Sequence, residues 1–393
     1  MSEIGRWRYR HTVLLLCVLA YFGVRFIEFA LSLVFPDIET ALGTSVFTIG
    51  VAVTASTVTY ALSQLPSGVL SDRFGERRVI IAALGLTGVA SLVLLVAPVG
   101  GAIVVGMSII GAVTGAYYSP ATALLSDLFE HTGRAIGIHR VGAQVVGLTG
   151  PVVTFLSVTY GWQAVPLASA ALVVPLTAGF ALFVRTRTPN RPDRSIREQL
   201  QPSRLRSLLS RPPVAFTAAI ASFAQFVDVA TFSFLPYILR AYVGLSSAVA
   251  GILFTLYFVV VAVAQPVAGW LSDRLGRDPV TVGSLLVGTV GLLGLLTGET
   301  TLTISGAVVC LGVGMGWNSP VQSRAIDLLA NDEQGTGFGL IRTVYIGFAS
   351  LSGIVVGSAV TLGGWASAIE TLVIVLFVPA AALCANATLR LGL

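Results

Sequence analysis

Residues 68–78 read Gly-Val-Leu-Ser-Asp-Arg-Phe-Gly-Glu-Arg-Arg, and this polar stretch decides the interpretation of the chain because its pattern returns once. Residues 269–278 read Gly-Trp-Leu-Ser-Asp-Arg-Leu-Gly-Arg-Asp, and Asp72 and Asp273 are 201 positions apart in a chain of 393 residues. Each copy lies between two long apolar runs. A shared Leu-Ser-Asp-Arg-x-Gly core at half-chain spacing indicates an internal repeat.

The composition is that of an integral membrane protein. Only 10% of the residues are charged and 55% are hydrophobic, whereas a soluble domain carries about 25% charged residues. The net charge of +5 comes entirely from arginine, because the chain contains no lysine. Basic residues of membrane proteins gather in cytoplasmic loops, so this charge does not indicate nucleic-acid binding.

Twelve apolar stretches are long enough to cross a bilayer, which takes about 20 helical residues. Between the sixth and the seventh lies 185–212, which holds eight arginines and four prolines and is predicted to be a polar linker, partly helical around 196–209. The sequence predicts an all-α membrane protein with six-helix halves at 1–184 and 213–393. The predicted spans are 11–35, 46–69, 78–98, 102–127, 135–157, 162–184, 213–238, 246–270, 278–297, 302–327, 337–361 and 364–388.

The arginines also predict the orientation. With the N-terminus inside the cell, nearly all of them fall on the cytoplasmic side, and the short outer loops hold only Arg240. This asymmetry is typical of multi-pass proteins. We therefore expect a protein of the plasma membrane with both termini and the linker in the cytoplasm.

The repeat extends into the apolar stretches. Arg25 aligns with Gln225 and Glu28 with Asp228, each 200 positions apart. The segment Tyr117-Tyr118-Ser-Pro in the first half aligns in the same way with Trp317-Asn318-Ser-Pro in the second. The two halves are therefore expected to have the same fold and the same orientation.

On these features the chain resembles the major facilitator superfamily of transporters over essentially its whole length. The family's signature between spans 2 and 3 is matched at 68–78, although Glu76 stands where the family usually has a basic residue. The resemblance implies two six-helix bundles around a central cavity that opens to alternate sides. It also implies that the two loops, with Asp127 and Arg134 in the same layer, close the cytoplasmic side. The expected gate residues are Gly68, Asp72, Arg73, Gly75, Arg77, Arg78, Asp127, Arg134, Gly269, Asp273, Arg274, Gly276 and Arg277.

Two acidic residues inside the membrane are the candidates for proton coupling. An ionisable group at such depth costs on the order of 3 kcal/mol and usually faces a cavity, and burial disfavours the charged form of a carboxyl group. Glu28 and its repeat mate Asp228 fit this description. Arg25 shares a helix face with Glu28, so two alternatives stay open: a structural ion pair, or an arginine that anchors an anionic substrate.

Several polar and aromatic residues are candidates for the substrate cavity, although the aromatic ones are equally compatible with packing. Tyr257 is a weaker candidate, and His139, a lone histidine near the start of a span, is expected at the surface. The cavity candidates are Arg25, Tyr117, Tyr118, Gln225, Trp317 and Asn318.

These patterns predict a secondary transporter that moves a small organic solute by alternating access, coupled to protons, as a monomer and without a metal or cofactor. Export of amphipathic or drug-like solutes is slightly favoured, because Gly147-x-x-Gly150-Pro151 is similar to a motif of proton-antiporting drug exporters, with Val146 where a glycine is expected. The alternative is uptake of a carboxylated or other polar metabolite, which Arg25 favours.

Other classes of protein fit the sequence less well. No G-x-x-x-x-G-K-[ST] segment for ATP is present. An enzyme would need a cluster of residues with catalytic or metal-binding spacing, and a receptor would more naturally carry a longer soluble part than 185–212. The sequence therefore predicts that the chain is not an enzyme.

Overall fold

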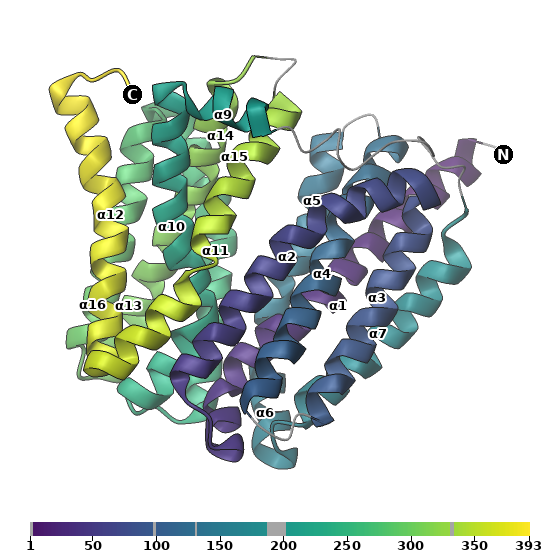
Figure 1. Cartoon of the computed structure of the whole chain (residues 1–393), viewed down its shortest axis with the longest axis horizontal. Coiled ribbons are helices and arrows are strands. Elements are labelled where there is room, and N and C mark those ends of the chain that lie inside the picture. Colours follow the sequence, from purple (N-terminus) through teal and green to yellow (C-terminus); the bar gives the residue numbers. More distant parts are fainter. Residues whose placement is uncertain (1–2, 97–99, 130–131, 187–201, 331–333) are drawn as a thin grey trace. The chain divides into compact units, whose positions relative to one another are not determined.

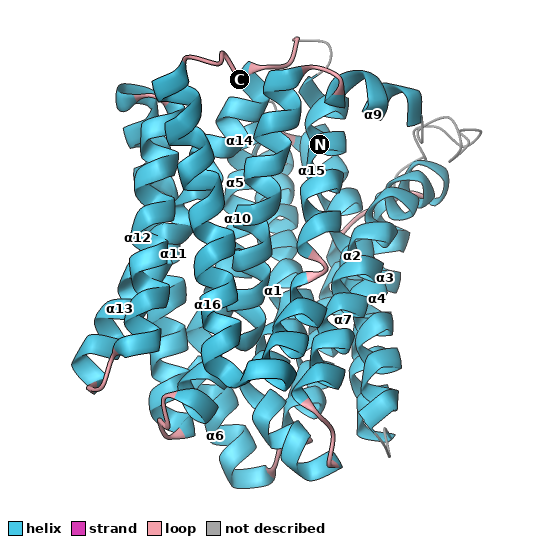
Figure 2. Cartoon of the chain, turned by 60° about the vertical axis from the view of Figure 1, so that its left-hand side comes forward, coloured by secondary structure: helices cyan, strands magenta, loops and turns pink. Residues whose placement is uncertain are grey.

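The computed structural model describes residues 3–96, 100–129, 132–186, 202–330 and 334–393, and these residues form helices joined by short turns and loops, without a strand (Figure 2). The chain divides into two compact units. The first comprises Met1–Thr48 and Ala55–Leu200, and the second comprises Ile49–Thr54 and Gln201–Leu393.

The first unit is built around α1, which packs against α4, α5 and α7, while α3 packs against α4 and α7 (Figure 1). Its core is formed by buried side chains of α1, α3, α4 and α7, among them Val24, Leu84, Leu124 and Phe180. The helices of this unit are α1 (Glu3–Leu42), α2 (Val46–Phe74, apart from Ile49–Thr54), α3 (Glu76–Val93), α4 (Gly100–Leu128), α5 (Thr132–Val145), α6 (Gly150–Tyr160) and α7 (Ala164–Phe183).

In the second unit α10 packs against α15 and α16, and α12 packs against α13 and α16. Figure 1 shows α9, α14 and the C-terminal residues gathered at one end of this unit. The helices are α9 (Pro202–Leu209), α10 (Pro212–Tyr237), α11 (Ser247–Leu275), α12 (Arg277–Thr297), α13 (Thr301–Gly314), α14 (Asn318–Asp327), α15 (Gln334–Ala349) and α16 (Ser352–Leu389).

The predicted all-α membrane fold is confirmed. Ten helical segments of the described residues are long and apolar enough to cross a membrane. The last of them, Gly337–Leu389, has 53 residues and holds two predicted spans, which meet at the non-helical Gly364 with φ 75°. The predicted span 78–98 corresponds to α3, whose 18 residues begin with three charged side chains. The twelve predicted stretches therefore all correspond to helices.

Two of the predicted spans are broken in the middle. Span 135–157 consists of α5 and α6 with a 3-10 turn at Val146–Thr149 between them, and span 302–327 consists of α13 and α14 with a 3-10 turn at Met315–Trp317. A proline clashes with the carbonyl four residues before it. Pro151 and Pro320 follow the two turns, and the residues four positions before them, Gly147 and Gly316, lie inside these turns.

The linker contains the helix α9, Pro202–Leu209, which falls within the range predicted to be helical. Residues 187–201 of the linker lie outside the described part of the chain.

Candidate functional site

The second glycine of each signature is the turn residue of its loop. Gly75 ends α2 at φ 87° and donates its N–H to Ser71 O at 2.8 Å, and Gly276 ends α11 at φ 95° and donates to Ser272 O at 3.1 Å. Glycine adopts positive φ without a steric penalty. The next helix begins at the following residue in both units, so the charged residues after the glycine lie in its first turn. Asp72 and Asp273 lie before the glycine, in the last turn of the preceding helix.

The first glycine of each signature marks the same helix contact in both units. A Cβ atom added to Gly68 on α2 would lie 3.8 Å from Ser119 Cβ on α4, and one added to Gly269 on α11 would lie 3.4 Å from Ser319 Cβ on α14. Ser119 and Ser319 are themselves 200 positions apart. The repeat seen in the sequence is therefore a repeat of packing.

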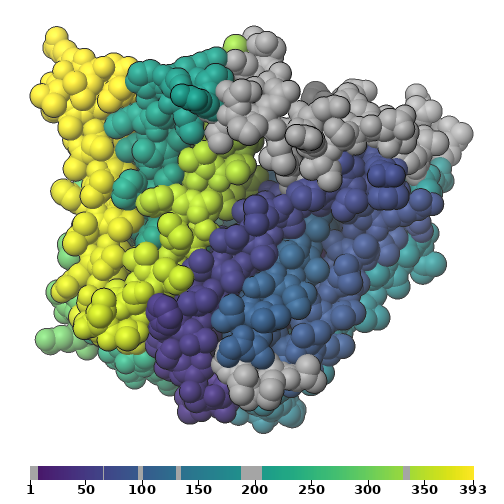
Figure 3. Space-filling view, viewed as in Figure 1, coloured from purple at the N-terminus to yellow at the C-terminus, as the bar shows by residue number. Residues whose placement is uncertain are grey.

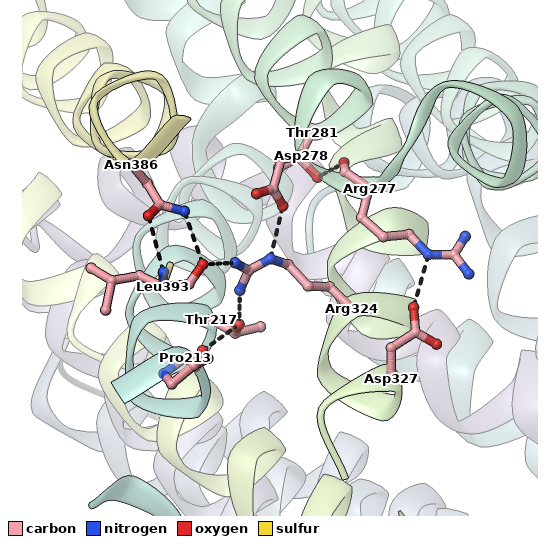
Figure 4. Close-up of polar contacts among 9 residues, drawn as sticks. All are labelled: Pro213, Thr217, Arg277, Asp278, Thr281, Arg324, Asp327, Asn386 and Leu393. Carbon is pink, nitrogen blue, oxygen red and sulfur yellow. Dashed lines mark hydrogen bonds and ion pairs between the residues drawn. The ribbon is translucent and has the colours of Figure 1, made fainter. Parts of the chain in front are cut away.

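Arg277 organises the charges at the start of α12 (Figure 4). It forms an ion pair with Asp273, its Nε lies 3.1 Å from Asp327 Oδ2, and its Nη1 donates to Ser272 Oγ at 2.9 Å. The two carboxylates are 67% and 57% exposed. Exposed ion pairs contribute little to stability, so these contacts fix the position of the loop more than they stabilise the unit.

Arg324 on α14 forms a second and less exposed cluster, which the sequence did not reveal. Its Nε donates to Asp278 Oδ1 at 2.8 Å, its Nη2 donates to Leu393 O at 2.6 Å, and its Nη1 donates to Thr217. One side chain thereby connects α14 with α10, α12 and the residues that follow α16 (Figure 4). The repeat gave no signal for it, because the residue 200 positions earlier is Leu124.

We expect the two arginines to differ in their effect on stability. Replacing Arg324 with methionine removes the partner of a carboxylate that is 33% exposed and should lower the free energy of unfolding by about 1–3 kcal/mol. The matched change of Arg277 to methionine should cost about 1 kcal/mol or less, because both of its carboxylate partners are well exposed. Thermal unfolding of the purified protein in detergent measures both, and equal losses would contradict this assignment.

The gate candidates of the first unit are arranged differently. Arg77 donates to Ala181 O in the last turn of α7 and, at 3.2 Å, to Thr186 Oγ1 just after this helix. The Arg73 guanidinium lies 5.4 Å from the centre of the Phe74 ring. Glu76, the departure from the family pattern, is buried.

The remaining candidates of this loop layer are the half-buried Asp72 and the exposed Arg78, Asp127 and Arg134. In the second unit, Arg274 lies 3.8 Å from the centre of the Trp270 ring.

Inside the first unit, Arg25 and Glu28 form an ion pair on α1. The other carboxylate oxygen of Glu28 accepts a hydrogen bond from Thr114 Oγ1 on α4 at 2.6 Å, and the guanidinium lies 5.6 Å from the centre of the Tyr60 ring on α2. The side chains of Arg25 and Glu28 are 24% and 11% exposed. The site is thus a neutral pair of opposite charges, held by one hydroxyl and one aromatic ring that the sequence did not single out.

The second unit carries a related arrangement without the arginine. Gln225 Nε2 donates to Asp228 Oδ2 at 3.1 Å, and the Tyr257 hydroxyl of α11 is hydrogen-bonded to the same carboxylate. The donor again precedes the acid by three residues, as in the first unit. The alignment of Arg25 with Gln225 and of Glu28 with Asp228 therefore describes equivalent contacts in the two units.

Two of the three aromatic cavity candidates are fully buried. Tyr117 and Trp317 are buried inside their own units, and the Tyr117 hydroxyl donates to Cys17 O at 2.7 Å. The adjacent Tyr118 and Asn318 are half-buried, and Asn318 Oδ1 accepts a hydrogen bond from Gln322. The burial of Tyr117 and Trp317 fits packing, which was the alternative for these aromatic residues.

The expectation that His139 lies at the surface is wrong. Its side chain is 0% exposed, its Nε2 lies 3.1 Å from the Tyr117 hydroxyl, and its ring stacks on Tyr21 with a centroid distance of 4.7 Å. The physical reason is that α5 packs along α1 and turns this residue inward, while the next residue, Arg140, remains exposed.

One acidic residue was overlooked although the sequence contained its signal. Glu370 interrupts the apolar stretch 364–388, but the residue 200 positions earlier is Ala170, so the repeat did not mark it. It is exposed on α16 together with Ile374 and Phe377, on the same helix face. In Figure 3 the surface of α16, coloured yellow, is exposed along most of the helix.

Known proteins have similar sequences and a similar fold. A probable nitrate/nitrite transporter of Mycobacterium tuberculosis is 28% identical over 276 residues, which are 65% of this chain and 66% of that protein. A probable sulfoacetate transporter of Cupriavidus necator is 24% identical over 380 residues, which are 90% and 87% of the two chains. The aligned part is 25% of a relative of Buchnera aphidicola, 66% of the Mycobacterium protein and 87% of the Cupriavidus protein.

Among solved structures, an inward-facing bacterial homologue of the human lysosomal transporter Spinster has the same fold. Its TM-score is 0.82 at 14% sequence identity, over 95% of this chain and 96% of that one. The family model described as Major Facilitator Superfamily matches residues 17–237 and 218–390. The chain therefore belongs to the Major Facilitator Superfamily of membrane transporters.

Proposed function

We propose that this transporter carries a small anion across the plasma membrane by alternating access, together with protons. The observation that carries the proposal is the ion pair between Arg25 and Glu28, which is tied to α4 through Thr114. Such a pair is neutral as it stands, and it can exchange its internal anion for an external one.

The exchange consists of two linked steps. A proton binds to the Glu28 carboxylate, which loses its charge and releases the Arg25 guanidinium. An anionic group of the solute then pairs with Arg25 in place of Glu28, within reach of the Tyr60 ring and the Thr114 hydroxyl. The proton and the anion together add no net charge, so the site remains neutral. A neutral site costs less free energy inside a membrane than a charged one.

Asp228 supports a second protonation step in the other unit. Gln225 and Tyr257 both hydrogen-bond to its carboxylate, and they contribute no opposite charge. We propose that a proton on Asp228 and the solute are carried in the same cycle. Bundles at 1–184 and 213–393 move about the linker 185–212, and the termini lie in the cytoplasm.

The cytoplasmic gate is a proposal separate from that of the solute. The loops at 68–78 and 269–278 hold the cytoplasmic side closed in one state, through Asp72 and Asp273 at equivalent positions. The turn and the helix contact are the same in both units, which is what two halves of one gate require. The protein acts as a monomer, and the cycle needs no cofactor.

The choice of an anion rests on two independent observations. Arg25 is the cation of the neutral pair, and it is 24% exposed. Two relatives that align with most of the chain are named for the transport of nitrate or nitrite and of sulfoacetate, which are small anions, while a third, aligned over 64% of the chain, is named for ectoine and proline. Uptake of a small carboxylate or sulfonate is therefore favoured over export of amphipathic solutes.

Export of amphipathic solutes is the second candidate, and one observation favours it. The segment that is similar to the motif of drug exporters falls on the break between α5 and α6, where Gly147 lies in the 3-10 turn and Pro151 begins the next helix. A break at this place gives the span a point at which its two parts can bend.

Flux measurements with the purified protein in liposomes test the proposal. Radiolabelled nitrate, sulfoacetate or acetate is supplied outside under an inward pH gradient, and parallel vesicles receive a cationic fluorescent dye. We expect accumulation of at least one anion that stops when a protonophore collapses the gradient. Transport of the dye alone would support the second candidate, and absence of flux for every anion would overturn the proposed substrate class.

A further inference from the structure

The hydrogen bonds around His139 define its tautomer. The Tyr117 hydroxyl has a single proton, which it donates to the carbonyl oxygen of Cys17 at 2.7 Å, because a carbonyl can only accept. The contact of 3.1 Å between this hydroxyl and His139 Nε2 must therefore be donated by the imidazole. Nε2 carries a proton, and in the neutral ring Nδ1 is a bare acceptor.

Nδ1 is buried and has no hydrogen-bond partner among the described residues. A buried acceptor without a partner is unfavourable, and either a donor or a proton relieves it. Three aromatic rings lie around the imidazole. His139 stacks on Tyr21 at 4.7 Å with 22° between the ring planes, and its centroid lies 5.8 Å from those of Tyr117 and Tyr118. Three aromatic rings at these distances favour a cation.

The charged and titratable groups that face this ring come from three helices. Cys17 and Tyr21 lie on α1, Tyr117 and Tyr118 on α4, and Arg140 on α5 is the residue next to His139. The positive charge of Arg140 opposes a second positive charge on the imidazole, and its side chain is exposed. Burial and, to a smaller extent, Arg140 disfavour the imidazolium, and the aromatic rings around it offset these two effects in part.

We propose that His139 is a protonation site of the first unit, separate from Glu28, which binds and releases a proton at Nδ1. Its link to the rest of the unit is Tyr21, whose other neighbours include Arg25, one helical turn further along α1. Tyr21 thus has the imidazole on one side and Arg25 of the ion pair among its other neighbours. A positive charge on the imidazole therefore acts close to the ion pair. The proposal does not depend on which solute is carried.

Histidine-selective ¹⁵N labelling tests the proposal directly, because the chain has only three histidines, His11, His131 and His139. The H139Q variant identifies the signal of His139 by its loss, since glutamine keeps an N–H donor for Tyr117 but cannot take up the proton. If that variant does not fold, H11Q and H131Q assign the remaining signal instead.

We expect the His139 signal to show the Nε2-protonated neutral form at high pH and to convert to the imidazolium as the pH falls. In R140Q the conversion should occur at a higher pH than in the wild type, because a neighbouring positive charge is gone. Y117F, which removes the hydroxyl but leaves the imidazole, should lose the Nε2-protonated preference. A single neutral form in the wild type and R140Q, at every pH at which the protein stays folded, would overturn the proposal.

A second measurement separates this site from Glu28. In E28Q/D228N, which lacks both proposed acidic sites, solute exchange driven by a concentration difference should keep a dependence on pH, and the E28Q/D228N/H139Q variant should lose it. Loss of the NMR titration would count against His139 alone, whereas loss of anion flux in the wild type would count against the proposed function and leave the titration of His139 unaffected.

Discussion

Replacing Glu28 with glutamine should abolish accumulation driven by a pH gradient and leave solute exchange intact. Each coupled proton supports an accumulation of about tenfold per pH unit across the membrane, since one unit corresponds to about 1.4 kcal/mol. Glutamine mimics the protonated acid, so the carrier can still bind and reorient but cannot release the proton. Accumulation ratios and counterflow rates in the same liposomes measure the two properties separately.

The matched control is Glu370, the acid exposed on α16. E370Q removes one membrane-embedded charge just as E28Q does, but it touches neither ion pair, so it should accumulate solute like the wild type. D228N provides the equivalent test in the second unit. Full accumulation by the E28Q/D228N double variant would end the claim of proton coupling and leave facilitated diffusion or another ion.

Replacing Arg25 with methionine should reduce the affinity for an anionic solute about 30-fold or more. Losing one partner of a desolvated charge pair costs about 2–5 kcal/mol, and every 1.4 kcal/mol is a factor of about ten in Kd. The R25M variant should also be less stable, because Glu28, which is 11% exposed, loses its ion-pair partner. Binding by isothermal calorimetry and thermal unfolding follow the two effects.

The R25M/E28Q double variant separates the two roles of Arg25. It has no unpaired charge at this site, so its stability should recover towards that of the wild type, while the affinity for the anion should stay low. Recovery of both properties would mean that Arg25 only neutralises Glu28, which was the structural alternative. The R25K variant keeps the charge and should retain part of the affinity.

The sequence predicted the fold because the signals for it are long and repeated. Each span is a continuous apolar stretch, and the repeat fixes the pairing of the halves through residues such as Gly68 and Gly269. The breaks in two spans were harder to predict from the sequence. The prolines are visible in the sequence, but the turn lies at Gly147 and Gly316, before the prolines, because the clash is with a preceding carbonyl.

The candidate site could be predicted only in part. The i,i+3 pairs at Arg25 and Gln225 were visible because both partners lie on one helix. Thr114 and Tyr257 reach the two acids from other helices, and Tyr60 reaches Arg25 from α2. Arg324 had no repeat mate of the same type. His139 is a single polar residue in a span, and only the packing of α5 on α1 decides which way it faces.

The ion pair on α1 also bears on how the chain enters the bilayer during synthesis. A lone arginine or acid at the centre of a span costs about 2.5–3.5 kcal/mol for insertion. Arg25 and Glu28 are partners within one helix, so α1 can pass into the lipid as a neutral segment before any later helix exists. α10 has no such internal counter-charge for Asp228, since Gln225 is only a hydrogen-bond donor. Its insertion therefore depends more on a protonated acid or on helices that have already been inserted.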